Sequence, residues 1–268
     1  MQPVRFYGDV PRPLRIIYPY YDREFPISPM TAFATVYTEE GFVIGADGRS
    51  YLDENKYNHD PSDRDVQKVF PMVLSQGVLA YAARGNVITE DGGFDVNTAI
   101  RHWIDEAKTY DEFHELLDAL AEHLADYVKC LLVSGLGGCY PILFINISGY
   151  FKGNPYHAQI EFLEFPVVPY QIYDLWVEHA IPGRVRPAAS SVIDGLVSRH
   201  DPRVCKPPTR ESNLYDATAF ITDYLNLCTS DLGRALDPSC IEFGGTVHVA
   251  EVTESEFRWH LPPPSYLQ

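Results

Sequence analysis

"PMTAFATVYTEEGFVIGADGRS", residues 29–50, contains two β-strand patterns joined by a short Glu-Glu turn. The runs "TAFATVYT" and "GFVIGAD" are rich in β-branched and aromatic residues, as strands are. If Thr38 pairs with Gly41 across the turn, the antiparallel register brings Thr31 beside Asp47. The sequence therefore predicts a hairpin whose open end places a threonine next to an aspartate.

A second hairpin is predicted from "KVFPMVL" and "GVLAYAARG", which a Ser-Gln turn joins. Its register places Lys68 opposite Ala83 and next to Arg84 and Gly85. Pro71 cannot donate a ladder hydrogen bond, so it is expected either to weaken the first strand of this hairpin or to place it at a sheet edge. Each hairpin is thus expected to have polar residues at the end away from its turn: Thr31 and Asp47 in the first hairpin, and Lys68 in the second.

The rest of the chain alternates between helical and strand patterns without βαβ units or repeats. The helical patterns lie at 100–107, 113–128 and 214–228, and the strand patterns at 140–151, 158–165, 244–252 and 257–261. This order predicts an α+β fold of antiparallel sheets with segregated helices. Residues 1–30, rich in Pro and Tyr, are expected to form an N-terminal arm or propeptide, residues 31–268 a single domain, and residues 181–208 a loop with a short helix.

Charge and composition narrow the classes of function. The 268 residues carry a formal net charge of −16, which argues against a nucleic-acid partner because such binding depends on Lys and Arg. No run reaches the roughly 18 apolar residues of a membrane span, and the N-terminus has no secretory pattern, so a cytoplasmic protein without a membrane partner is expected. The five cysteines form no CxxC pair and the nine histidines show no ligand spacing, so neither a metal nor a cofactor is expected.

A threonine, an aspartate and a lysine at hairpin ends suit amide hydrolysis. If Thr31 becomes the first residue, its α-amino group, with a pKa of about 7.7–8.0, can take the hydroxyl proton at neutral pH. The Lys68 ammonium would favour the alkoxide, and Asp47 would keep that lysine charged. Backbone N–H groups around Arg84 and Gly85 could stabilise the tetrahedral oxyanion.

The stretch from "TAFATVYTEEGFVIGADGRS" through "RDVQKVF" to "GVLAYAARGN" resembles the start of proteasome β-type subunits and the bacterial proteasome-like peptidase, which are N-terminal-nucleophile hydrolases. The closing "FGGTVHVAEV" is similar to their late Gly-Gly strand. The resemblance implies a four-layer α/β/β/α sandwich, in which two antiparallel sheets lie between helix layers. It also implies cleavage of amide bonds by an N-terminal threonine.

Four residues match the family's catalytic motif. Thr31 matches the nucleophile and Asp47 the acid of a Gly-Ala-Asp-x-Arg motif, while Arg49 matches the basic partner of that acid. Lys68 matches the lysine before a Val-Phe pair. Around these residues the chain departs from the family at four places. Met30 replaces the glycine before a self-cleaved threonine, and Arg84 replaces the first glycine of a pair. The segment between Asp47 and Lys68 is longer, and Asp237, Ser239 and Glu242 are out of register with the family's supporting Asp and Ser.

The resemblance implies a proteasome-like threonine amidohydrolase that acts on a peptide or small amide and forms a homo-oligomer, with a ring as one form. Two alternatives share the fold: a non-catalytic structural subunit and an amidase for a small amide. Catalysis by Thr31 requires that residues 1–30 be absent from the active form. Either self-cleavage at Met30-Thr31 or initiation at Met30 followed by removal of that methionine would achieve this, and the second route is favoured because the residue before the threonine is not glycine.

Overall fold

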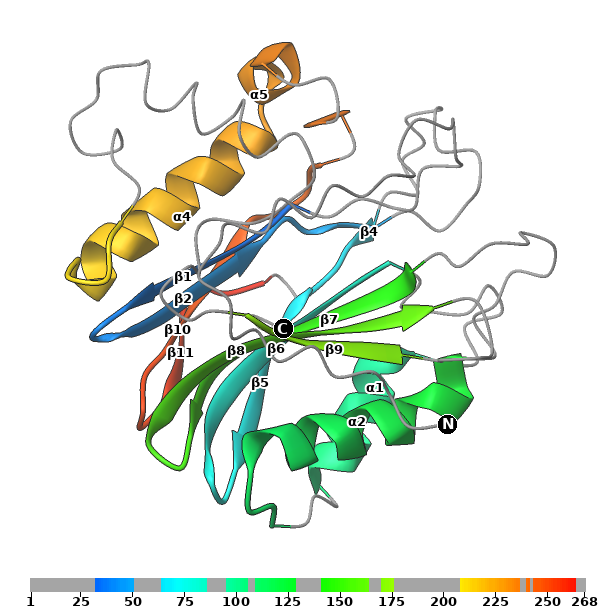
Figure 1. Cartoon of the computed structure of the whole chain (residues 1–268). Coiled ribbons are helices and arrows are strands. Elements are labelled where there is room, and N and C mark those ends of the chain that lie inside the picture. The colour runs from blue at the N-terminus through cyan, green and yellow to red at the C-terminus, as the bar shows by residue number, and fades with distance from the viewer. Residues whose placement is uncertain are drawn as a thin grey trace, which may run out of the picture.

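The computed structural model describes residues 32–50, 64–85, 95–105, 109–128, 141–163, 170–175, 208–236, 240–241 and 243–263. Within these ranges the chain forms two antiparallel sheets of four and five strands, a short two-stranded pair and four helices (Figure 1). The predicted arm at 1–30, Thr31 and nearly all of the region 181–208 lie outside the described residues.

The four-stranded sheet contains the first predicted hairpin and the last one. Its strands, in spatial order, are β1 (Phe33–Thr38), β2 (Gly41–Ala46), β10 (His248–Val252) and β11 (Phe257–Leu261). The predicted register of the first hairpin is confirmed, because Thr38 faces Gly41 and Phe33 faces Ala46. Just beyond the paired residues, the N–H of Asp47 donates to the C=O of Ala32 at 3.0 Å. This bond holds the two chain segments together at the end of the hairpin away from the turn.

The five-stranded sheet contains the second predicted hairpin. Its strands, in spatial order, are β5 (Val69–Leu74), β6 (Gly77–Gly85), β7 (Pro141–Phe151), β8 (Asn154–Leu163) and β9 (Tyr170–Leu175). The register of this hairpin is also as predicted, since Val69 faces Ala82. Pro71 lies in β5, which forms the edge of the sheet as expected.

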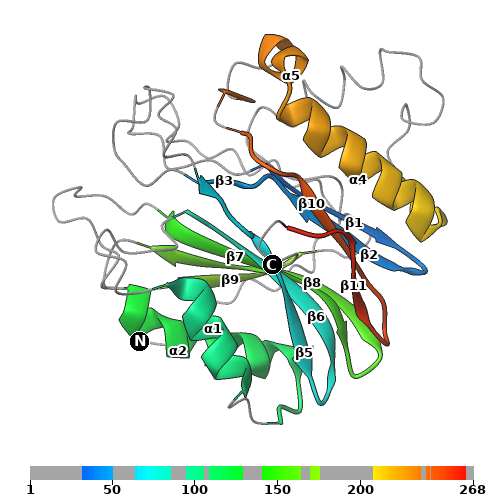
Figure 2. The same ribbon diagram turned by 180° about the vertical axis from the view of Figure 1, so that it is seen from behind.

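The helices cover opposite sides of the molecule. Helix α4 (Leu214–Cys228), followed by the short α5 (Asp231–Leu236), packs on β1, β2 and β10, whereas α1 (Val96–Asp105) and α2 (Phe113–Val128) pack on strands of the five-stranded sheet. Figures 1 and 2 show both arrangements from opposite sides. Helix α4 has the predicted bounds and is capped by Asn213, whose side chain accepts a hydrogen bond from the N–H of Asp216.

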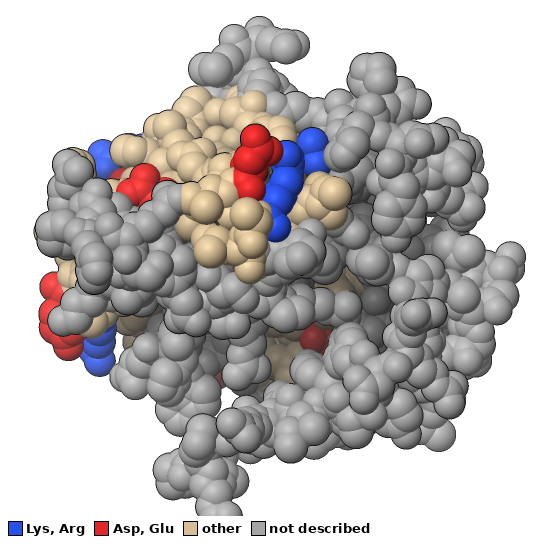
Figure 3. Space-filling view, turned by 90° about the horizontal axis from the view of Figure 1, so that it is seen from above, with Lys and Arg blue, Asp and Glu red and all other residues tan. Residues whose placement is uncertain are grey.

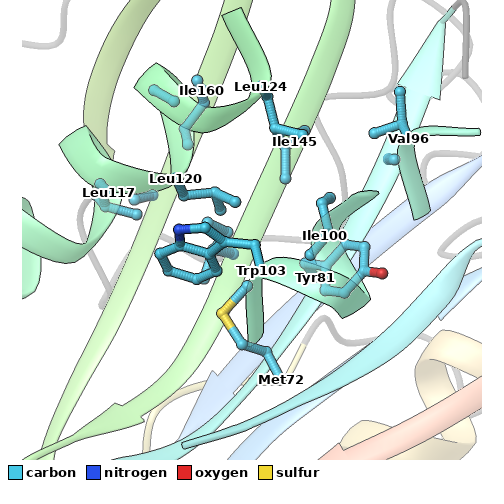
Figure 4. Close-up of a cluster of buried hydrophobic side chains, with 14 of the residues drawn as sticks. Met72, Tyr81, Val96, Ile100, Trp103, Leu117, Leu120, Leu124, Ile145 and Ile160 are labelled. Carbon is cyan, nitrogen blue, oxygen red and sulfur yellow. The ribbon is translucent and has the colours of Figure 1, made fainter. Parts of the chain in front are cut away.

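Apolar burial holds α1 and α2 to the five-stranded sheet. The Trp103 indole of α1 lies beside Met72 of β5 and close to Leu120 of α2 (Figure 4). Complete burial of one such apolar side chain stabilises the fold by about 1.5–3 kcal/mol. The buried apolar side chains between these helices and the sheet are therefore the main reason for the position of both helices.

One glycine of the opening stretch determines how closely α4 approaches its sheet. A Cβ built on Gly45 of β2 would lie 2.6 Å from Leu225 Cδ1 and 2.8 Å from Ile221 Cγ2, both on α4. Any larger residue at this position would therefore push the helix away from the strand. The face of β2 opposite α4 packs against the other sheet through Phe42, Ile44 and neighbouring apolar residues.

Figure 3 shows the molecule from above. The Lys and Arg side chains and the Asp and Glu side chains of the described residues form small groups of both signs in this view. Arg234 and Asp231, both in α5, form an ion pair at 2.8 Å. None of the described helices is both long and apolar enough to cross a membrane.

The pH dependence of stability is expected to depend on His157 of β8. Its Nδ1 lies 2.7 Å from Ser148 Oγ of β7, and burial lowers the pKa of His157 to about 4. Between about pH 6.5 and 4 the unfolded chain therefore binds a proton at this residue that the folded chain does not bind. The free energy of unfolding should fall by up to about 3 kcal/mol as the pH decreases through this range.

Urea unfolding at pH 7.5 and pH 4.5 measures this dependence. In His157→Gln the loss of stability between pH 7.5 and pH 4.5 should be smaller by about 2.5 kcal/mol, whereas His102→Gln, at an exposed position of α1, should behave like the unsubstituted chain. Equal acid sensitivity of His157→Gln and the unsubstituted chain would contradict the assignment.

Candidate active site

The Asp47 carboxylate lies at the centre of the candidate site. Asp47 follows β2 and is completely buried. Its Oδ1 accepts hydrogen bonds from the N–H of Ala32 and from Lys68 Nζ, both at 2.9 Å, and its Oδ2 accepts one from the N–H of Gly244 at 3.0 Å. Three segments that are distant in the sequence therefore meet at one carboxyl group.

The Lys68–Asp47 ion pair is buried, with a 2.9 Å contact and less than a tenth of either side chain exposed. Burial raises the pKa of the Asp47 carboxyl above its ordinary value, while the Lys68 ammonium and the amides of Gly244 and Ala32 oppose this rise. Water screens such a pair little, so each partner depends on the other for compensation of its charge.

Lys68 reaches Asp47 because the chain before it pairs with the chain after the aspartate. The short strands β3 (Arg49–Ser50) and β4 (Arg64–Asp65) are antiparallel neighbours. The N–H of Val66 also donates to the C=O of Gly48 at 2.7 Å. Lys68 lies two residues after Val66 and directly before β5. This local pairing therefore brings the ends of the two predicted hairpins together.

Arg49 contacts the segment before β10. Its Nη1 donates to the C=O groups of Ile241 and Phe243 at 3.0 and 3.2 Å, and its backbone N–H donates to the C=O of Gly244 at 2.8 Å. A Cβ on Gly244 would lie 2.6 Å from Arg49 Cζ, so glycine gives the guanidinium its room. Through Gly244, which donates its N–H to Asp47, Arg49 supports the aspartate. The role of Arg49 as the basic partner of Asp47 stays a prediction.

Arg84 and Gly85 end strand β6. Their partners on β7 are Phe144 and Leu143, and β6 continues beyond Ala82, where the pairing with β5 ends. The proposed use of their backbone N–H groups for an oxyanion stays a prediction.

Thr31 itself lies outside the described residues, as do Asp237, Ser239 and Glu242. The residue covalently joined to Thr31, however, is Ala32, whose N–H donates to Asp47. The structure therefore brings together Ala32, Asp47 and Lys68. Arg49 contacts Gly244, which in turn donates to Asp47. In the described part of the chain, no three or more His, Cys, Asp or Glu side chains are arranged to hold a metal ion.

His248, the first residue of β10, also contacts the site and was not predicted from the sequence. Its Nε2 accepts hydrogen bonds from the backbone N–H of Lys68 at 3.0 Å and of Val69 at 3.3 Å. The signal was a histidine inside the otherwise apolar strand pattern "TVHVA". A single histidine with no second ligand-type residue at metal spacing gives no recognisable site pattern.

Comparison with known proteins finds similarity in structure but not in sequence. No protein-family model matches the chain, and no curated protein matches it significantly in sequence. Among solved structures, the chain is similar to Anbu (ancestral beta-subunit) from Yersinia bercovieri, with 12% identity, 87% of this chain and 88% of that chain covered, and a TM-score of 0.49.

Proposed function

We propose that the chain is an N-terminal-nucleophile amidohydrolase of the proteasome-like type, with Thr31 as its nucleophile. The observation that carries the proposal is the buried Lys68–Asp47 pair, hydrogen-bonded to the amide of the residue that follows Thr31. The motif resemblance adds the roles of these residues. We further propose that the two sheets and their helices form the four-layer sandwich of that family.

In the first step, the free α-amino group of Thr31 removes the proton from its own Oγ1, which attacks the amide carbonyl carbon. The Lys68 ammonium stabilises the developing negative charge on Oγ1 and disfavours protonation of the neighbouring amine. Asp47 keeps the lysine charged and oriented, because its carboxylate lies 2.9 Å from Nζ. No histidine is needed as a base.

The tetrahedral intermediate then collapses. Its oxyanion is stabilised by backbone N–H groups at Arg84 and Gly85, and the C–N bond breaks as the α-ammonium of Thr31 protonates the leaving amine. An ester between Oγ1 and the acyl group remains. Water, activated by the same α-amino group, hydrolyses the ester and restores the threonine, so atoms and protons balance over the cycle.

The experiment is the intact mass of the protein from its native source, before and after treatment with an electrophilic peptide directed at N-terminal threonine. Catalysis requires a mature chain that begins at Thr31 and gains one label. A chain that retains residue 1 or 2 and gains no label would overturn the proposal and leave a non-catalytic member of the fold.

The resemblance also supports self-assembly, since proteasome β-type subunits close symmetric rings. Static light scattering at micromolar concentration should therefore give a mass several times the 30.3 kDa of one chain. A mass equal to one chain across the concentration range would refute this expectation.

A further inference from the structure

We infer that His248 is a positioning residue for Lys68: its imidazole fixes the backbone from which the ammonium reaches Asp47. The inference rests on the proposed function, because it assigns His248 to the same site. It assigns the imidazole a positioning role and no role as a base.

Both ring nitrogens of His248 are engaged. Nε2 accepts from the N–H groups of Lys68 and Val69, and Nδ1 lies 3.3 Å from the C=O of Thr246. Only one protonation state satisfies these contacts: a lone pair on Nε2 and a proton on Nδ1, which donates to the Thr246 carbonyl. The hydrogen-bond network therefore assigns a neutral imidazole of defined tautomer.

The ring is held in place by its surroundings. His248 is completely buried, and it faces Ala46, the residue before Asp47, in the ladder between β10 and β2. The Trp259 ring of β11 meets the imidazole edge-on, with 6.1 Å between the ring centres. A side chain fixed in this way can hold the main chain of another segment in place.

The contacts of His248 cross between the two sheets. β10 pairs with β2, which leads to Asp47, whereas Lys68 leads into β5 of the other sheet. The distance between Nζ and the carboxylate thus depends on how the start of β5 sits against β10. A displacement of about 1 Å at a catalytic group can cost about 10²-fold in rate. The two hydrogen bonds that fix the Lys68 backbone should therefore have a large effect on kcat.

A neutral acceptor suits this place better than a carboxylate. A negative side chain at position 248, one residue along the ladder from Asp47, would repel that carboxylate and compete for the Lys68 ammonium. The imidazole accepts backbone hydrogen bonds without adding charge. The inference therefore predicts different results for two substitutions that both supply an acceptor, His248→Gln and His248→Asp.

The test uses the mature full chain and three variants at position 248. We expect His248→Leu to lower kcat for an amide substrate by about 10- to 100-fold with KM changed less than about threefold, because transition-state positioning appears in kcat. His248→Gln should retain most of kcat, and His248→Asp should lose as much as His248→Leu. The matched control is His157→Leu, another histidine-to-leucine change in the sandwich, and it should keep kcat near that of the unsubstituted protein.

A second readout does not need activity. Hydrogen exchange of the Lys68 and Val69 amides should accelerate in His248→Leu and stay slow in His248→Gln, relative to other amides of β5. Unchanged exchange, or an unchanged kcat in His248→Leu, would overturn the inference. If His248→Leu does not fold, the pair His248→Gln and His248→Asp decides, and equal kcat in these two would overturn it.

The two hypotheses fail in distinguishable ways. If the unsubstituted protein takes no label at Thr31, the proposed function fails, and amide exchange then still shows whether His248 holds the Lys68 backbone. If labelling succeeds while the variants at position 248 match the unsubstituted protein in kcat, only the inference about His248 fails.

Discussion

Thr31→Ala is expected to abolish both covalent labelling and amide hydrolysis. Alanine lacks Oγ1, so no ester can form, and loss of a nucleophile typically costs at least about 10⁴-fold in kcat. The α-amino group and the Lys68–Asp47 pair remain, but they have no hydroxyl on which to act. Intact mass after treatment with the electrophilic peptide, together with kcat, measures the effect.

The conservative control is Thr31→Ser, which keeps a hydroxyl on the same carbon and should take one label per chain. Persistent labelling of Thr31→Ala at the original stoichiometry would assign the reaction to another residue. The N-terminus of each variant must be sequenced, because a variant that keeps residues 1–30 lacks the free amine for a different reason.

Replacement of Lys68 by methionine is expected to lower kcat by about 10²–10³-fold while KM changes little. Methionine fills a similar volume but carries no charge, so the alkoxide loses its cation and the amine of Thr31 its cationic neighbour. Steady-state kinetics on one substrate at several pH values separates the two parameters. A change confined to KM would place Lys68 in substrate binding instead.

The same substitution should destabilise the fold, because it leaves the buried Asp47 carboxylate without its cation. Removing one partner of a buried pair typically costs about 3–5 kcal/mol. Lys152→Met is the matched control: the Lys152 side chain is 45% exposed and lies 3.6 Å from Asp111, so its loss should change stability by less than about 0.5 kcal/mol. Kinetics of Lys68→Met therefore belong at a temperature where urea curves show it folded.

The two hairpins were predictable from the sequence because a two-residue turn fixes the register of both strands. The pairs Thr38–Gly41 and Val69–Ala82 follow from turn length alone. Helix α4 was predictable for a similar reason, since its apolar face repeats at helical spacing over its whole length. Strand β9 was not predicted, because no two-residue turn joins it to another strand pattern.

The contacts within the candidate site were less accessible to sequence reasoning. The aspartate and the lysine were identified from motif spacing, but the ends of the two hairpins carry no local signal of their mutual distance. His248 and Gly244 reach the site through the pairing of β10 with β2, a contact between distant parts of the chain. No turn length or periodicity encodes such a contact, and a single neutral histidine has no recognisable spacing.

The hydrogen bond from Gly244 to Asp47 joins residues that are 197 positions apart in the chain. During synthesis Asp47 is therefore made well before its donor Gly244. At about 5–20 residues per second, a ribosome needs roughly 10–40 s to travel from one to the other. Throughout that time Asp47 lacks one of its donors, and the strand that carries His248 does not yet exist. The hydrogen bonds around the Asp47 carboxylate are therefore incomplete in the nascent chain until the segment that contains Gly244 has emerged.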